Sequence, residues 1–181
     1  MLFRSKKVLG PEHPHTLVSM VHLAIAYSDQ GKYEKAEHLK PKVLDLCNKV
    51  LGPEHPQTLI SMAHLAGTYS DQGKYEKAEE LQLKVVDLYK KVLGLENPQT
   101  LRSMANLAIT YSDQGNYEEA EELELKVLNL HKMLLGPDHP DTLTSMANLV
   151  TIYSDQGKHE AAGELQLKIL DLHKNVQWPG T

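Results

Sequence analysis

The chain has 181 residues, a formal net charge of -5 and a sequence pI near 6.0. Lysines and glutamates are interspersed along it, so the sequence lacks the basic patch that a nucleic-acid-binding domain needs. Cys47 is the one cysteine, so no disulfide can form within the chain. There is no signal-peptide pattern and no apolar run near ~18 residues. We therefore expect a cytoplasmic protein that binds neither nucleic acid nor membrane.

A stretch of the form Leu-Gly-Pro-Glu-His-Pro-x-Thr-Leu, read here from residues 51–59, occurs four times with small changes. Its glycines follow one another at intervals of 42 residues and are Gly10, Gly52, Gly94 and Gly136. Residues 11–52 and 53–94 are identical at 31 of 42 positions. Self-similarity at a fixed period indicates a repeat array, in which neighbouring repeats pack in nearly the same way.

Each repeat contains two helical patterns, which are clearest in residues 53–94. Pro56 suits the first turn of a first helix, and Gly73 ends that helix because glycine accepts the left-handed conformation. The apolar face of the first helix consists of Leu59, Met62, Leu65, Ala66 and Tyr69. The second helix has a wider apolar face, made of Tyr75, Ala78, Leu81, Val85, Val86, Leu88, Tyr89, Val92 and Leu93. A face of this width predicts neighbours on two sides.

The chain begins with residues 1–10, which align with the end of a repeat, and we expect them to be the end of a truncated preceding repeat. Four repeats follow, at 11–52, 53–94, 95–136 and 137–176. The C-terminal tail, 177–181, contains Trp178, which either covers the last helix pair or is unpacked. No sustained alternation of a strand occurs. We expect an all-α solenoid, a right-handed superhelix of antiparallel helix pairs.

One residue breaks the pattern of the second helices. Pro41 stands where the other repeats have Leu83, Leu125 and Leu167. A proline inside a helix removes one hydrogen bond and costs roughly 3 kcal/mol or more. We therefore expect either a kink near Lys40 or early loss of that helix.

The repeat resembles the tetratricopeptide repeat. The residues that carry the resemblance are Met62, Leu65, Ala66 and Tyr69 in the first helix, then Gly73, Tyr75 and Ala78. The pattern recurs at 20–36, 104–120 and 146–162, with Val150 and His159 as departures in the last copy. The period of 42 and the long second helix resemble the kinesin light chain type, as found in fungal NACHT or NB-ARC signalling proteins.

The resemblance implies a non-catalytic protein–protein interaction scaffold, whose concave wall consists largely of the first helices. We expect that wall to bind a peptide or a partner helix. Asn side chains there can hold a peptide backbone because they donate and accept hydrogen bonds. Carried over by position, the peptide-binding residues are Val18, His22, Ile25, Ile60, His64, Arg102, Asn106, Ile109, Thr144 and Asn148. The alternative is a homo-oligomer that assembles through uncapped terminal repeats.

Other polar residues recur once in each repeat, and we interpret them structurally. The aspartates Asp29, Asp71, Asp113 and Asp155 favour local turn formation. His13, His55 and His139 lie in the linkers, where a hydrogen bond to the turn is the simplest role. Cys47 is interpreted as a helix-packing or surface residue.

We expect neither a metal nor a cofactor nor catalysis. His22 and His64 occupy equivalent positions, but packed helices lie ~8–10 Å apart, too far for one zinc ion to bridge. A catalytic site needs distinct groups that converge in one pocket, and here each polar type is spread along the array.

Overall fold

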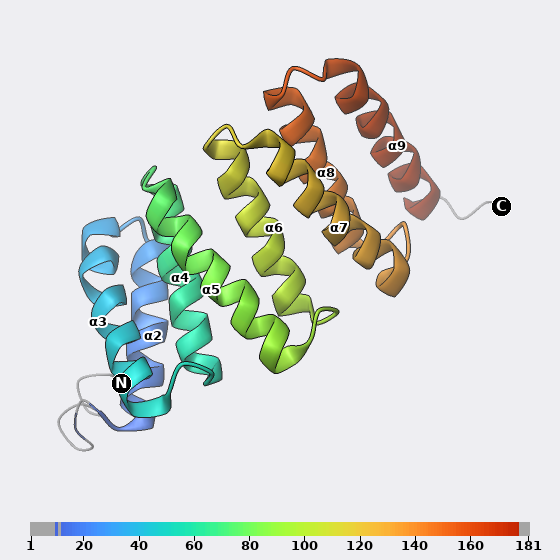
Figure 1. Cartoon of the computed structure of the whole chain (residues 1–181). Helices are drawn as coiled ribbons and strands as arrows, with labels where there is room; N and C mark the ends of the chain where they lie inside the picture. Colours follow the sequence, from blue (N-terminus) through green and yellow to red (C-terminus); the bar gives the residue numbers. More distant parts are fainter. Residues whose placement is uncertain (1–9, 11, 178–181) are drawn as a thin grey trace. The chain divides into compact units, whose positions relative to one another are not determined.

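The computed structural model describes residue 10 and residues 12–177, which form α-helices and no strand (Figure 1). The eight helices are α2 (Pro14–Asp29), α3 (Tyr33–Leu51), α4 (Pro56–Asp71), α5 (Tyr75–Leu93), α6 (Pro98–Asp113), α7 (Tyr117–Leu135), α8 (Pro140–Asp155) and α9 (His159–Gln177). They pack in consecutive pairs, which confirms the expected all-α class. Neither Trp178 nor residues 1–9 belong to the described part.

The chain divides into two compact units, one ending at Val92 and one beginning at Leu93. Unit 1 contains α2, α3, α4 and nearly all of α5, and unit 2 contains α6, α7, α8 and α9. Each unit is described by itself below. No helix of the described residues is long and apolar enough to cross a membrane.

A linker histidine caps the N-terminus of three of the first helices. In α4, the Gln57 N–H donates a hydrogen bond to Nδ1 of His55 at 3.2 Å, and Pro56 lies in the first turn. His13 and His139 accept equivalent bonds at the starts of α2 and α8. The cap gives a partner to a backbone N–H that has none within the helix, so the expected role of these histidines is confirmed.

A glycine stops each first helix. After α4 ends at Asp71, Gly73 adopts a φ of 69°, which reverses the chain. This turn lets the Lys74 N–H donate to the carbonyl of Tyr69 at 2.8 Å. The bond gives a partner to a carbonyl in the last turn of the helix. Gly73 is therefore confirmed as the stop signal.

The core of unit 1 lies on both sides of α3, which packs against α2 and against α4. Val43 is 1% exposed and Cys47 is fully buried, and both pack with Leu17 of α2. The full burial of Cys47 confirms its role as a packing residue, and it also raises the pKa of the thiol. A second cluster joins α4 to α5 and contains Leu59, Met62, Leu65, Val85 and Tyr89.

Unit 2 repeats this arrangement around α7, which packs against α6 and α8. Val127 and Leu128 are buried on its apolar face, and Met146 and Leu149 of α8 complete the core. The predicted neighbours on two sides of a second helix are confirmed for α7. One member of the enclosed face is a carboxylic acid, because Glu124 is fully buried.

Helix α3 runs without interruption through Pro41 and has 19 residues, as do α5, α7 and α9. The expected early loss of this helix is therefore wrong. Two buried neighbours explain its persistence, since Lys40 and Val43 are held in the core on either side of the proline. Their packing outweighs the one backbone hydrogen bond that the proline cannot donate. The kink near Lys40 stays a prediction.

Replacing Pro41 with leucine is expected to stabilise unit 1. The leucines at this position in the other repeats are partly exposed, at 41% for Leu83 and 36% for Leu125, so the new side chain fits on the surface. The variant P41L restores the missing N–H and should raise the free energy of unfolding by about 1–3 kcal/mol. Urea denaturation measures it, with L125P as the reciprocal control that should lose stability. An unchanged midpoint in P41L would contradict this explanation.

Candidate peptide-binding surface

The ten residues expected to bind a peptide lie on first helices, and none of them is fully buried. We call these ten residues the candidate surface. In unit 1, α2 carries Val18, His22 and Ile25, and α4 carries Ile60 and His64. In unit 2, α6 carries Arg102, Asn106 and Ile109, and α8 carries Thr144 and Asn148.

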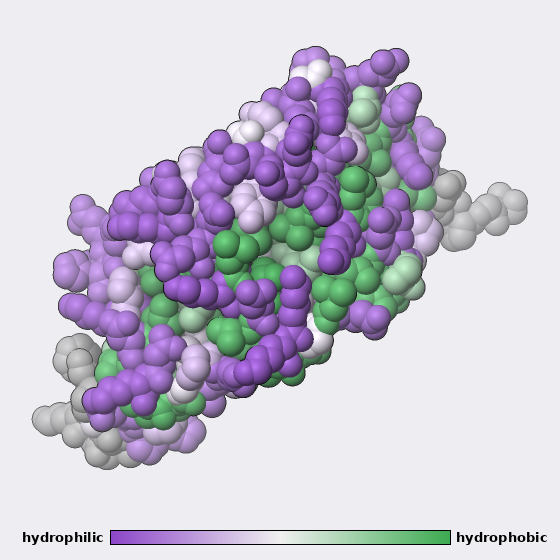
Figure 2. All heavy atoms as spheres, in the orientation of Figure 1, coloured by the Kyte–Doolittle hydropathy of each residue, from purple (hydrophilic) through white to green (hydrophobic). Residues whose placement is uncertain are grey.

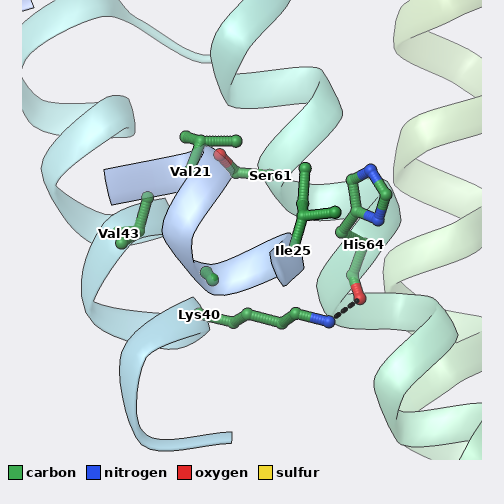
Figure 3. Close-up of a pocket in the computed structure, with 7 residues that line it drawn as sticks. Val21, Ile25, Lys40, Val43, Ser61 and His64 are labelled. Atoms are coloured by element: carbon green, nitrogen blue, oxygen red, sulfur yellow. Dashed lines mark hydrogen bonds between the residues drawn. The ribbon is translucent and has the colours of Figure 1, made fainter. Parts of the chain in front are cut away.

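In unit 1 two residues of the candidate surface border a small cavity. A cavity of about 10 Å³ lies between α2, α3 and α4, and Ile25 and His64 stand at its edge (Figure 3). A cavity of this size holds at most about one water molecule. Val21 also lines this cavity and is 2% exposed. Ile25 and Ile60 are partly buried and also pack against an apolar cluster that contains Leu17, Val21 and Val43.

Lys40 crosses the floor of this cavity from α3, and its side chain is 5% exposed. Its ammonium donates to Ser28 Oγ at 2.7 Å, to the carbonyl of His64 at 3.2 Å and to Thr68 Oγ1 (Figure 3 shows the bond to His64). These three bonds use all three ammonium protons. Lys40 therefore ties α2 to α4 and offers no proton to a ligand.

Burial disfavours the charged form of Lys40, and nearby carboxylates favour it. Burial lowers the pKa of its ammonium, while the nearby carboxylates of Asp71 and Asp29 act in the opposite direction. The aspartates at the ends of α2 and α4 thus do more than form turns, because they help to keep a buried cation charged. Sequence reasoning did not anticipate this electrostatic role.

In unit 2 the candidate surface is hollowed by a cavity of about 290 Å³ between α6 and α8. We call it the α6–α8 cavity. Its lining consists of Pro98, Gln99, Arg102 and Ala105 of α6, His131 of α7, and Asp141, Thr144, Ser145 and Asn148 of α8. The structure therefore brings together Arg102, Thr144 and Asn148 from the expected set. Asn106 and Ile109 are exposed on α6 and lie outside this lining.

Buried polar residues connect the floor of the α6–α8 cavity to α7. His131 Nδ1 and Ser145 Oγ lie 2.9 Å apart, and both residues are buried. Nδ2 of Asn148 donates to Oε1 of Glu124 at 3.2 Å. Oε2 of Glu124 has no hydrogen-bond partner among the described residues. Glu124 thereby orients Asn148, one of the residues expected to hold a peptide.

Burial shifts the titration of both groups beneath this cavity. It raises the pKa of Glu124 to about 7, although hydrogen bonds from Asn148 and Ser145 act against the shift. It lowers the pKa of His131, with the Asp141 carboxylate acting in the opposite direction. His131 is therefore held in its neutral form near pH 7, and the Glu124 carboxyl exchanges a proton close to neutrality.

The residues that sequence reasoning missed share one signal. Glu124, His131 and Ser145 lie on helix faces that the apolar pattern predicts to be core, whereas the predicted peptide-binding residues lie beside those faces. Glu124 occupies the position of Lys40 and Gln82, so a column of polar residues within an apolar face was visible in the sequence. Such a column predicts buried side chains that need partners on neighbouring helices.

No group of three or more His, Cys, Asp or Glu side chains in the described part of the chain is arranged to hold a metal ion. The α6–α8 cavity instead offers mixed donors and acceptors. The side chains that line it suit a polar ligand held by hydrogen bonds.

Comparison with known proteins agrees with this architecture. Models of the tetratricopeptide repeat match residues 36–91, 62–132 and 142–176. The chain therefore belongs to the tetratricopeptide repeat family, whose members are generally non-catalytic scaffolds for protein–protein interaction. Among curated proteins, none matches the chain by sequence.

Within that family the chain is of the kinesin light chain-like type. It is similar to a Podosopora anserina protein with nearly identical TPR-like repeats that is assigned as a kinesin light chain. A point variant of that protein is 33% identical with a TM-score of 0.87, and the match covers 97% of this chain and 83% of that one.

A more distant match shows the fold alone. BtubC (BKLC) from P. vanneervenii is 17% identical with a TM-score of 0.80, over 90% of this chain and 65% of that one.

Titration of Glu124 is expected to make the stability of unit 2 depend on pH. Its pKa in the folded chain, about 7, exceeds the ordinary 4.5, so the folded state retains the proton that the unfolded state loses. Stability should fall as the pH rises from about 4.5 to above 7, by up to about 3 kcal/mol. E124Q removes this group and uses the residue found at Gln82.

Urea unfolding at pH 5 and pH 8 provides the test. The variant should gain stability over the parent chain as the pH rises, whereas E122Q, an exposed change on the same helix, should follow the parent. Equal pH profiles for E124Q and the parent chain would refute the assignment.

Proposed function

We propose that the chain is a non-catalytic scaffold that binds a peptide or a partner helix along the concave face formed by its first helices. The observation that carries the proposal is the α6–α8 cavity, which three residues of the candidate surface border: Arg102, Thr144 and Asn148. A hollow of about 290 Å³ can receive a ligand side chain, and the polar groups around it can fix its orientation.

The two units would contribute differently to such binding. Unit 1 offers Val18, Ile25 and Ile60 beside two exposed histidines, His22 and His64. In unit 2 Arg102 and Asn148 line the α6–α8 cavity, and Asn106 lies on α6 outside its lining. We infer apolar contacts in the first case and hydrogen bonds in the second. The repeat boundaries at 52, 94 and 136, the cytoplasmic location and the setting in a fungal signalling protein are part of the same proposal.

Peptides selected against the full chain from a random display library provide the test. R102A/N106A/N148A removes three polar groups from the candidate surface and should weaken a selected peptide by tenfold or more, since each lost hydrogen bond contributes about 0.5–1.5 kcal/mol. Fluorescence anisotropy with labelled peptide measures the affinity.

The matched control is E122A/K126A/N129A, which changes three exposed residues of α7 outside the candidate surface. It should keep the parent affinity. If the α6/α8 variant keeps every selected peptide at full affinity, the ligand does not bind on the first helices and the proposal fails.

A second candidate function is self-association, and exposed apolar residues favour it. Figure 2 shows apolar patches among the hydrophilic residues of the face drawn. On α9, Leu170 is 49% exposed, whereas Leu44 and Leu128 at the equivalent position are 7% and 3% exposed. The following first helix covers those two leucines. Light scattering after size-exclusion chromatography separates the two functions. Assembly through the exposed side of α9 predicts a dimer, which the variant L170K should dissociate.

A further inference from the structure

The chain contains its own reference for the α6–α8 cavity, because unit 1 has the same positions two repeats earlier. Val21 corresponds to Ala105, and Val18 corresponds to Arg102. On the next first helix, Ile60 corresponds to Thr144. In unit 2 Arg102, Ala105 and Thr144 line the cavity of about 290 Å³, whereas Val18 and Ile60 do not line the cavity of about 10 Å³ in unit 1.

The two helices that border the α6–α8 cavity carry opposite charges. Arg102 lies on α6, and its guanidinium donates one hydrogen bond to Gln99 Oε1 at 2.8 Å. The guanidinium has five N–H groups, so others remain for a ligand. Asp141 lies on α8 and has its carboxylate 3.7 Å from His139 Nδ1. That nitrogen accepts the Asp141 backbone N–H at 3.1 Å, so it carries no proton toward the carboxylate.

Arg102 and Asp141 do not pair with each other, since the described ion pairs include none of Arg102. Arg102 therefore presents hydrogen-bond donors to the cavity from α6. Asp141 presents an acceptor to the same cavity from α8. The floor has the same mixed character. Asn148 gives one N–H to Glu124 and retains its own carbonyl, and the ring of His131 is held neutral by burial.

These groups discriminate between classes of ligand side chain. A carboxylate would be attracted by Arg102 but would meet Asp141 at close range, and an ammonium would meet the reverse conflict. An apolar side chain would strip water from both charges and replace none of the hydrogen bonds. A carboxamide presents a carbonyl that can accept from Arg102 and an NH2 group that can donate to Asp141.

We propose that the α6–α8 cavity binds the carboxamide side chain of an Asn or Gln residue of the peptide. The inference rests on the proposed function, and it assigns to unit 2 the recognition of one residue type. In unit 1 Val18 and Ile60 replace Arg102 and Thr144, and their apolar side chains offer no hydrogen bond to a carboxamide.

The test uses the full chain labelled with 15N and three small probes, N-acetylglutamine methylamide and its glutamate and norleucine counterparts. The glutamine probe should shift the backbone amide signals of Arg102, Thr144 and Asn148, with no change at Val18 and Ile60. It should bind about tenfold more tightly than either counterpart, as expected for two hydrogen bonds that only the carboxamide completes.

Two variants borrow residues from the equivalent positions of the chain. R102V introduces the residue of α2, and D141Q introduces the residue of α4 and α6. Each should weaken the glutamine probe several-fold and reduce its advantage over the norleucine probe. E122A on the exposed face of α7, outside the candidate surface, is the control and should leave the probe affinity unchanged.

The inference is overturned if the glutamate or norleucine probe binds as tightly as the glutamine probe, or if no probe shifts the signals of unit 2. It would fail alone if selected peptides still required Arg102, Asn106 and Asn148 but tolerated replacement of every Asn and Gln. Peptides that bind the triple variant at full affinity would instead defeat the proposed function itself.

Discussion

Helices α3 and α7 are each enclosed between two first helices, and the rest of each unit depends on this burial. In unit 1 α3 lies between α2 and α4, and in unit 2 α7 lies between α6 and α8. Val43 and Val127 at the centre of these faces are at most 1% exposed. A polar residue on such a face must find its partners on the neighbouring first helices, because water does not reach it. Lys40 bonds to the carbonyl of His64, and Glu124 bonds to Asn148. The buried polar residues of the core therefore bond to first-helix residues of the candidate surface.

The same helix packing accommodates a buried ammonium in unit 1 and a buried carboxyl group in unit 2. Lys40 places a cation beneath the candidate surface of unit 1, between Asp29 and Asp71. Glu124 places a carboxyl at the same position of unit 2, and there burial and the charge of Asp155 raise the pKa of Asp113. Substitutions on an unchanged repeat can thus vary the local charge and the size of a hollow while the helix packing stays the same. This independence explains how a repeat array can acquire specificity for a ligand without losing its fold.

Most of the fold could be predicted from the sequence, since the signals are local and occur four times. As predicted, α4 begins with Pro56 in its first turn and ends just before Gly73. The predicted apolar face from Leu59 to Ala66 is buried in the core. The sequence could not predict that α3 continues through Pro41, because this depends on how strongly other helices hold Lys40 and Val43. For the candidate surface, the sequence predicted which side chains lie on first helices. The α6–α8 cavity is lined by residues of three helices, among them Ala105, His131 and Ser145, so its size follows from their packing and only the structure shows it.

The central claim is that ligands bind on first helices whose residues are oriented by the enclosed second helices. A crystal structure of the full chain with a display-selected peptide tests it most directly. We predict that the peptide contacts Arg102, Thr144 and Asn148, and that the Asn148–Glu124 hydrogen bond remains in place beneath it. A peptide seated on the exposed faces of α7 or α9, with the α6–α8 cavity unoccupied, would contradict the account.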